Sequence, residues 1–199
     1  MAVSGDGSLV VAGGCNHPIY TSTNFGVTWS TPPWPDPAGD QTAHFWMGIA
    51  CSNNGVKIVA VAGGYQGGAS DYIYTSTNSG ATFTQRTSAG QRDWVAATSS
   101  SDGTLLAAAA TGGFLYTSTD SGVTWTARAS SQNWRGIASS SDGTKLVASA
   151  LSGLLWTSQD AGVTWRGCGT IKTWNGVSMD SSGDKMFACA NQGLLFATY

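Results

Sequence analysis

The stretch Tyr116–Thr126 reads YTSTDSGVTWT, and close copies of it begin at Tyr20, Tyr74 and Trp156. The copies read YTSTNFGVTWS, YTSTNSGATFT and WTSQDAGVTWR in the same order. Recurrence of one pattern at intervals of tens of residues is the sequence signature of a repeat architecture. The sequence therefore predicts that one supersecondary unit has been duplicated along the chain.

Each copy predicts a strand, a tight turn and a second strand. Leu115–Thr117 and Val123–Trp125 contain the β-branched and aromatic residues that suit a pleated, half-buried surface. Between them, Asp120 can accept hydrogen bonds from backbone N–H groups, and Gly122 can supply the positive φ that the turn needs. Trp125 can then lie over the turn and bury its large ring.

The four copies resemble the Asp-box (BNR) repeat, whose pattern is S-x-[DN]-x-G-x-T-[WF]. The residues that carry this resemblance, copy by copy, are Ser22, Asn24, Gly26 and Trp29; Ser76, Asn78, Gly80 and Phe83; Ser118, Asp120, Gly122 and Trp125; and Ser158, Asp160, Gly162 and Trp165. Asn replaces Asp in the first two copies, which keeps the hydrogen-bond acceptor and loses the charge. We therefore expect these residues to form turns rather than to take part in catalysis or bind metal.

The resemblance covers nearly the whole chain once the flanks of the boxes are included. The Asp-box family is known for β-propellers, among them sialidases, some endoglucanases, sortilin-type receptors and photosystem II assembly factors. In that family the box lies on the periphery of the blade, away from the active site. The resemblance therefore implies a fold, and it implies a function only weakly.

The complete repeat is clearest from Trp134 onward. Trp134–Ala138, Lys145–Ala150, Leu154–Trp156 and Val163–Arg166 predict four antiparallel strands. Four strands in a period of about 40 residues are typical of a propeller blade. The predicted fold is all-β: a single-domain, five-bladed β-propeller of four-stranded antiparallel blades with an incomplete last blade. The predicted blades are 1–30, 46–84, 94–126, 134–166 and 174–199.

The last predicted blade lacks an Asp box and a fourth strand, so its edge is unpaired. Unpaired strand edges favour association with another chain. Three outcomes remain open: a three-stranded blade, an edge covered by a neighbouring chain in an oligomer, and a chain that is part of a longer repeat array. An open β-solenoid and an oligomeric propeller are the alternatives to the five-bladed ring.

Composition narrows the possible partners and cofactors. The formal net charge of −2 does not favour nucleic acid as a partner, and no apolar window is long enough to predict a membrane span. The first ten residues, MAVSGDGSLV, show no secretory signal, so the compartment is undetermined, and it is extracellular if a leader was removed.

Cys15, Cys51, Cys168 and Cys189 lack metal-binding spacing, and we expect small buried thiols rather than disulfides. No metal and no cofactor are predicted.

The two ends of the predicted blades differ in how far their loops vary. One end combines the Asp boxes with near-identical turns, whereas the other, which we call the variable face, has loops that differ between repeats. Binding residues tend to lie on variable loops of a rigid scaffold. Six of the nine basic residues are assigned to the variable face: Arg86, Arg92, Arg128, Arg135, Arg166 and Lys172. Asp36, Asp40, Asp71, Asp93, His17 and His44 are assigned there too, so we expect a mildly basic surface that attracts anionic groups weakly.

Aromatic residues suggest two kinds of ligand contact on the variable face. Trp46, Trp94, Trp134 and Trp174 begin the innermost strands, where they could wedge between blades as core or form a platform for planar ligands. Trp34 lies in a proline-rich insertion, and Tyr65 lies in a glycine-rich loop. The candidate ligand-binding residues are Trp34, Asp36, His44, Trp46, Tyr65, Asp71, Arg86, Arg92, Trp94, Arg128, Trp134, Arg135 and Trp174.

The sequence predicts a non-catalytic propeller that binds a ligand through the variable face, with glycans or other small polar ligands first. A protein–protein scaffold is the alternative, and a glycoside hydrolase of the Asp-box type is the second alternative. The resemblance implies that a sialidase would need a catalytic Glu, and this sequence contains none. Asp pairs could still support a two-carboxylate mechanism, although no catalytic residue is predicted.

Overall fold

The computed structural model describes residues 1–33, 44–63, 70–191 and 195–198, and the regular structure in these ranges is β-strand. Among the described residues, no helix is long and apolar enough to cross a membrane. We call the ranges 1–30, 46–84, 94–126, 134–166 and 174–199 repeat units one to five, as the sequence defines them.

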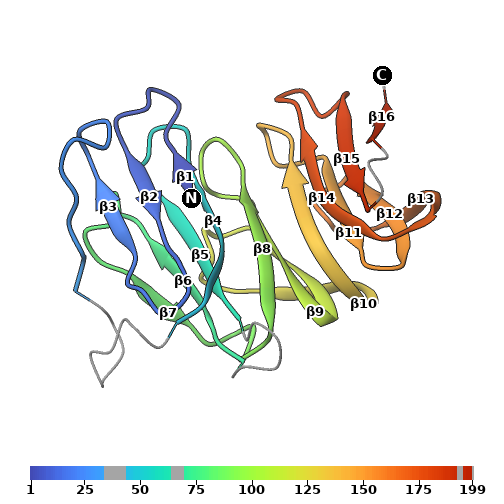
Figure 1. Cartoon of the computed structure of the whole chain (residues 1–199), viewed down its shortest axis with the longest axis horizontal. Coiled ribbons are helices and arrows are strands. Elements are labelled where there is room, and N and C mark those ends of the chain that lie inside the picture. Colours follow the sequence, from blue (N-terminus) through green and yellow to red (C-terminus); the bar gives the residue numbers. More distant parts are fainter. Residues whose placement is uncertain (34–43, 64–69, 192–194, 199) are drawn as a thin grey trace.

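The strands form four antiparallel sheets, shown in Figure 1. The first sheet contains β1 (Ala2–Val3), β2 (Val10–Ala12) and β3 (Tyr20–Ser22). The second contains β4 (Trp46–Cys51), β5 (Ile58–Ala62), β6 (Ile73–Ser76) and β7 (Thr84–Arg86). The third contains β8 (Trp94–Ser99), β9 (Leu106–Ser118), β10 (Thr126–Ser139), β11 (Leu146–Ala150), β12 (Gly153–Ser158) and β13 (Arg166–Lys172). The last contains β14 (Trp174–Met179), β15 (Met186–Ala190) and β16 (Leu195–Thr198).

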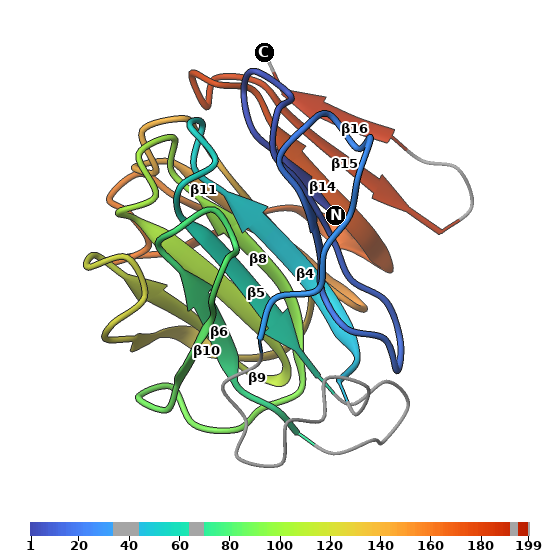
Figure 2. The same cartoon turned by 90° about the vertical axis from the view of Figure 1, so that its left-hand side faces the viewer.

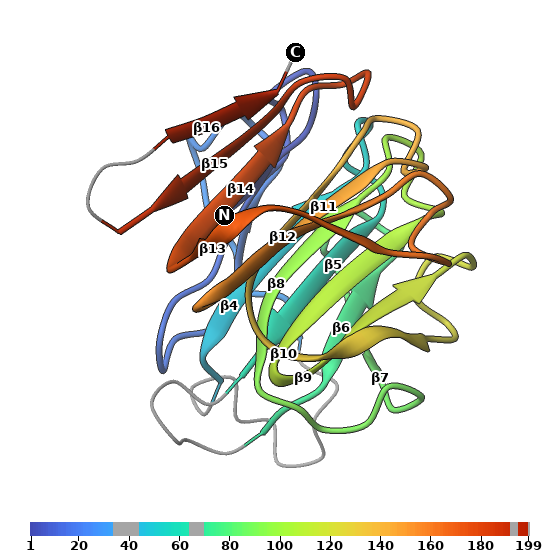
Figure 3. The ribbon, with the colours of Figure 1, turned by 90° about the vertical axis from the view of Figure 1, so that its right-hand side faces the viewer.

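Neighbouring strands in each sheet are also neighbours in sequence, so every sheet is an antiparallel meander. The prediction of an all-β, antiparallel fold is confirmed. In Figure 1 the sheets follow one another in an arc from β1–β3 at the left to β14–β16 at the right. Figure 2 and Figure 3 show this arc from its left and right sides.

The third sheet is larger than the predicted four strands because units three and four share it. β9 reverses direction within its span. Thr104 lies just before the start of β9 and Ser121 just after its end, and the Ser121 N–H donates to the Thr104 carbonyl at 3.1 Å, so the two ends lie side by side. β10 pairs with β9 through Thr126–Arg128 and with β11 through Trp134–Ser139. A single strand therefore serves as the last strand of unit three and the first strand of unit four.

The Asp boxes form the expected turns, but the prediction that Val123–Trp125 is a strand was wrong. The Asp120 carboxylate accepts the Thr124 N–H at 2.9 Å and the Thr124 hydroxyl at 2.6 Å. Because these donors are used within the turn, ladder pairing begins only at Thr126. The Trp125 indole N–H donates to the Gly122 carbonyl at 3.0 Å, which holds the ring over the turn.

A serine and two residues with positive φ complete each box. The Ser118 hydroxyl donates to Asp120 at 2.7 Å and accepts the Gly122 N–H at 2.9 Å. Both Ser121 (φ 59°) and Gly122 (φ 85°) have positive φ, which costs a residue with a Cβ about 1–2 kcal/mol. In the second unit the Asn78 amide donates to the Thr82 hydroxyl instead, at 2.8 Å. The amide and the carboxylate thus support the same turn.

The apolar core lies between consecutive units. Val11 and Ile19 of unit one pack with Trp46, Ala60 and Tyr74 of unit two. The same arrangement recurs between units two and three, three and four, and four and five. Since side chains alternate across a strand, one face of each inner strand packs on the preceding unit and the other face packs on the following unit.

A series of backbone hydrogen bonds also links the units, at the turns that follow their first strands. Gly5 N–H donates to the Asn53 carbonyl, Asn53 to Ser101, Ser101 to Ser141, and Ser141 to Ser181, at 2.7–2.8 Å. Among the described residues, no bond of this kind links Ser181 back to Gly5. The links therefore run in series along the arc.

The box geometry predicts opposite effects for two adjacent substitutions. An added Cβ at Gly122 would lie 2.6 Å from Thr75 Cγ2 of the preceding unit, in addition to the strain of a positive φ. We expect Gly122→Ala to lower the free energy of unfolding by about 1–3 kcal/mol. We expect Ser121→Gly to leave it unchanged or raise it by up to about 1 kcal/mol. Urea denaturation would measure both, and equal effects would contradict the proposed strain.

The carboxylate boxes also predict acid sensitivity. The hydrogen bond from the Thr164 hydroxyl, with those from the Thr164 N–H and the Ser158 hydroxyl, lowers the pKa of Asp160 from 3.8 to about 2. A pKa that is lower in the folded state stabilises the protein above the unfolded value, and this stabilisation is lost as the pH falls from about 4 toward 2. Asp160→Asn should make the urea midpoint less dependent on pH in this window, and Asn78→Asp should make it more dependent. Parallel acid profiles for the two variants would contradict this account.

Candidate functional site

Five of the predicted ligand-binding residues converge at the junction of units one, two and three. They are His44, Trp46, Asp71, Arg92 and Trp94. His44 precedes β4, Asp71 precedes β6, Arg92 precedes β8, and Trp94 is the first residue of β8. We call the group of His44, Asp71 and Tyr74 the histidine cluster.

The histidine cluster is a compact polar group inside an apolar junction. His44 Nδ1 lies 2.5 Å from Asp71 Oδ2, and the His44 side chain is 8% exposed. The other carboxylate oxygen of Asp71 accepts the Tyr74 hydroxyl at 3.0 Å and the Tyr72 N–H at 2.7 Å. The His44 ring packs against Trp46 and Tyr74, with ring centroids 5.2 and 5.4 Å away.

Hydrogen bonds determine the charge state of Asp71. Burial raises the pKa of this carboxyl, but the hydrogen bonds from His44, the Tyr72 N–H and the Tyr74 hydroxyl outweigh burial and hold the pKa below its ordinary value. The carboxylate is therefore ionised at neutral pH, and it is the acceptor on which His44 and Tyr74 both depend.

Arg92 is joined to this cluster through its backbone. Its backbone pairs with Asp71 through two hydrogen bonds of 2.8 and 2.9 Å, and the Trp94 indole donates to the Asp71 carbonyl at 2.9 Å. The Arg92 guanidinium lies over the Tyr116 ring, 5.2 Å from its centroid. This exposed side chain is therefore held in place by stacking on an aromatic ring.

Arg86 and Arg128 occupy equivalent positions in units two and three and are held alike. The Arg86 Nε donates to the Thr75 hydroxyl at 2.7 Å, and the Arg128 Nε donates to the Thr117 hydroxyl at 3.2 Å. Both side chains are partly buried, whereas Arg135 is exposed on β10. The structure does not bring Arg86, Arg128 and Arg135 into the histidine cluster.

The four strand-initial tryptophans lie inside the core. Trp46 is 6% exposed, Trp94 and Trp134 are 0% exposed, and Trp174 is 1% exposed. The indole groups of Trp46, Trp94 and Trp134 donate to the carbonyls of His17, Asp71 and Gly113, each in the preceding unit. Burial argues against an aromatic platform formed by these rings. They pack between units as core residues instead. Trp34, Asp36, Asp40 and Tyr65 lie outside the described residues.

The cysteines differ from the predicted buried thiols. Cys15 and Cys189 are exposed and Cys51 and Cys168 are partly buried, and all four are free. Cys189 is exposed because none of the described residues packs over its face of β15 as a further unit would. Among the described residues, no group of three or more His, Cys or Asp side chains is placed to hold a metal ion.

Sequence reasoning missed Tyr74 as a member of the histidine cluster. Tyrosine or tryptophan recurs at this position in every box, so Tyr74 reads as a structural residue. The useful signal is Asp71, because His17, Gly113 and Gly153 occupy its position in units one, three and four. A carboxylate that occurs in one unit, at a position where the other units have none, indicates a polar partner within that unit.

A second polar feature lies at the opposite end of the units. A hollow of about 260 Å³ is lined by the linked turns of all five units, including Asn53, Ser101, Ser141 and Ser181. Asp180 also lines it, at the position where the other units have a serine. Its carboxylate accepts the Lys185 N–H and the Ser182 hydroxyl, so it is used within its own turn.

Comparisons with known proteins give a structural likeness only. No family model and no curated protein matches the sequence. The structure is similar to an ancestral GH74 enzyme, with a TM-score of 0.75 and 16% identity over 99% of this chain and 30% of that chain. It is also similar to YCF48 bound to D1 peptide, with a TM-score of 0.69 and 15% identity over 100% of this chain and 63% of that chain.

The β-propeller domain of Cps50 (Swd1) from Myceliophthora thermophila is similar with a TM-score of 0.69 and 12% identity, over 96% of this chain and 66% of that chain. This chain therefore spans under a third of the GH74 enzyme and less than two thirds of YCF48. The likeness supports the predicted relation to β-propellers at the level of the fold.

The histidine cluster predicts a specific loss of stability. Asp71→Asn removes the charged acceptor of His44 and Tyr74, and we expect it to lower the free energy of unfolding by about 1–3 kcal/mol. The control is Asp184→Asn, which removes an exposed carboxylate paired with Lys145 at 2.6 Å and should change stability by less than about 1 kcal/mol. Urea denaturation at neutral pH would compare the two, and equal effects would show that the cluster is not stabilising.

Proposed function

We propose that the chain is built from five Asp-box propeller blades and that it binds a ligand through the variable face without catalysis. Acidic glycans are the leading ligand class. The blade number follows from the five sequence units, and the structural likeness to propellers supports the fold on which the proposal is built. The sequence assigns His44, Asp71, Arg86, Arg92 and Arg128 to the variable face.

The observation that carries the proposal is how the arginines of this face are held. Arg86 and Arg128 are anchored through Nε by threonine hydroxyls, and Arg92 is stacked on Tyr116. Among the described residues, no acceptor is found for the terminal guanidinium nitrogens, so they can donate to a ligand, and little side-chain freedom has to be lost on binding. Oriented guanidinium groups suit carboxylate and sulfate groups, because both present paired oxygens. Acidic saccharides combine such groups with hydroxyls.

The described carboxylates favour binding over hydrolysis. Asp71 is used by His44 and Tyr74, and Asp120, Asp142 and Asp160 are used within turns. A glycoside hydrolase needs two carboxyl groups facing one bond, one of them as a proton donor. The described turn carboxylates have lowered pKa values, which is unfavourable for that donor.

A protein partner is the second candidate. YCF48 bound to D1 peptide is similar over the whole of this chain, and that protein is a propeller fold with a peptide ligand. Oriented arginines would equally suit an acidic side chain or a terminal carboxylate of a peptide. The two candidates share the same side chains and differ in the ligand that those side chains select.

An experiment that separates the candidates starts from the two equivalent arginines. A glycan array with neutral, carboxylated and sulfated saccharides would identify a ligand, and calorimetry would measure its affinity. We expect the Arg86→Ala/Arg128→Ala variant to bind an acidic saccharide at least about tenfold more weakly. The control is Lys185→Ala, which removes one positive charge from the opposite end and should leave binding within about twofold.

The glycan proposal fails if the folded protein binds no saccharide on the array or in solution. A stoichiometric protein partner whose binding is lost in the double arginine variant would then establish the second candidate. Equal loss of binding in the Lys185→Ala control would show that overall charge, rather than the arginine positions, controls binding.

A further inference from the structure

The four interfaces between units follow one rule of side-chain placement. In β5, Val59 and Val61 face unit three, whereas Ile58, Ala60 and Ala62 face unit one. All five are at most 2% exposed. An inner strand therefore needs a unit on each side, one for each of its faces.

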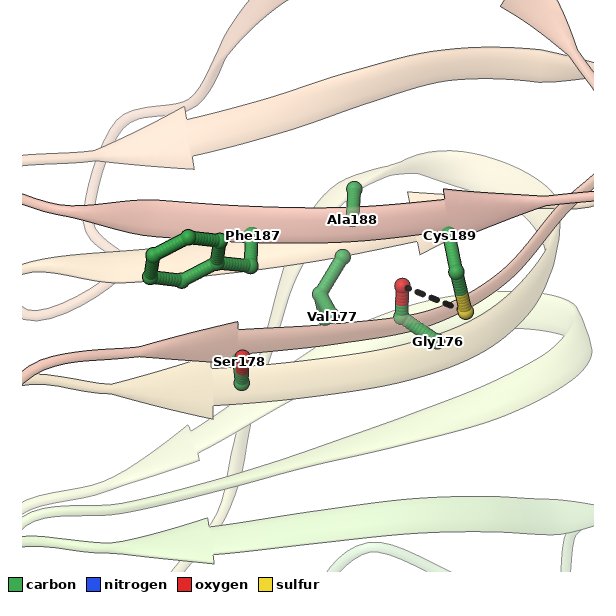
Figure 4. Close-up of a pocket in the computed structure, with 6 residues that line it drawn as sticks. All are labelled: Gly176, Val177, Ser178, Phe187, Ala188 and Cys189. Carbon is green, nitrogen blue, oxygen red and sulfur yellow. Dashed lines mark hydrogen bonds between the residues drawn. The ribbon is translucent and has the colours of Figure 1, made fainter. Parts of the chain in front are cut away.

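Among the described residues, no unit covers one of these faces of unit five. Phe187 stands at the position of Val59 and Val147, which are 0% and 1% exposed, yet Phe187 is 37% exposed. Cys189 stands at the position of Ser149, which is 0% exposed, and it is exposed as well. The two side chains border a hollow of about 330 Å³ on β14 and β15, shown in Figure 4.

A glycine on the same face shows what kind of element is missing. Gly48 and Gly136 occupy one position in units two and four, where an added Cβ would lie 2.8 Å and 3.3 Å from atoms of the following unit. Gly176 is their equivalent in unit five, and an added Cβ there would meet only the Cys189 sulfur of its own sheet. The glycine allows another sheet to approach closely, and among the described residues no sheet does so.

Unit one shows the complementary exposure on its opposite face. Tyr20 is 38% exposed, whereas its equivalents Tyr74 and Tyr116 are 3% and 4% exposed. Trp29 of the first box is 45% exposed, whereas Trp125 of the third box is 7% exposed. In units two and three these aromatic positions pack on the preceding unit, whereas none of the described residues packs on this face of unit one in that way.

We propose that unit one of a second copy of this chain packs on unit five, so that the two exposed faces form a fifth interface between units. Each face is one half of an interface that this chain forms four times. On the unit-five half, Gly176, Ser178, Phe187 and Cys189 bring no charge that would have to be buried. Among the described residues of one copy, no turn-to-turn bond joins the two faces, since the series of linked turns ends at Ser181.

Such an interface joins two different surfaces and is therefore heterologous. A heterologous contact closes into a ring if the rotation allows it, and otherwise it extends into a chain of molecules. The proposal does not depend on the ligand, because the arginines and the histidine cluster lie on other surfaces. Its failure would leave the proposed ligand binding untouched.

Light scattering coupled to size exclusion would test the proposal on the full chain between about 1 and 200 µM. We expect the mass to rise with concentration, from one copy to two or more. Phe187→Asp blocks the unit-five half and Tyr20→Asp blocks the unit-one half, so each variant alone should remain a monomer. Val163→Asp is the control, because Val163 is a 55% exposed apolar side chain away from both faces, and it should assemble as the original protein does.

The decisive measurement is the mixture of the two blocked variants. Each retains the half that the other lacks, so an equimolar mixture should form a dimer that contains one copy of each and should not grow further. Circular dichroism would establish that both variants are folded. The proposal is overturned if the original protein is monomeric throughout the concentration range, if either variant still assembles alone, or if the mixture remains monomeric.

Discussion

Burial of both faces of every inner strand is the constraint on which this molecule depends. β5 and β11 are buried along their whole length, and they consist of alanine, small β-branched residues, leucine and serine. Small side chains allow the sheets to approach closely on both sides, and the apolar area is removed from water only when units stack. A single unit would leave two apolar faces in water, so its stability comes from its neighbours.

The Asp boxes support this packing mainly through hydrogen bonds within each turn, and one side chain of each box packs toward a neighbouring unit. Each box consumes its own donors in a local turn and places one aromatic ring back toward the preceding unit. The turn tolerates amide or carboxylate, as the equivalent bonds of Asn78 and Asp120 show. Local turn chemistry and packing between units therefore favour the same geometry, which is typical of sequences that fold to one structure.

Much of this fold could be predicted because the repeat displays each position several times. The approximate strand positions, the antiparallel order and the aromatic residue over the turn follow from comparing equivalent residues, whereas the start of β10 at Thr126 does not. The continuous β10 could not be predicted, because pairing across the linker depends on how two units approach each other. The histidine cluster was predicted only in part: His44 and Asp71 stand out as individual residues, whereas Tyr74 is concealed by the repeat. The sequence could not decide whether the four tryptophans form an aromatic platform, because that depends on their solvent exposure and the residue type alone does not determine exposure.

The shared third sheet has a consequence for how the molecule comes apart. Units one, two and five have separate sheets and depend on neighbours through side-chain packing, turn-to-turn bonds and a few bonds near the starts of β4 and β8. Units three and four are joined in addition by the ladder of β10, so breaking one of them disrupts the other. Linear repeat arrays lose their ends first, and the region of lowest local stability exchanges its amide hydrogens fastest. The paired units in the middle should thus act as one cooperative block, with the slowest hydrogen exchange in the chain.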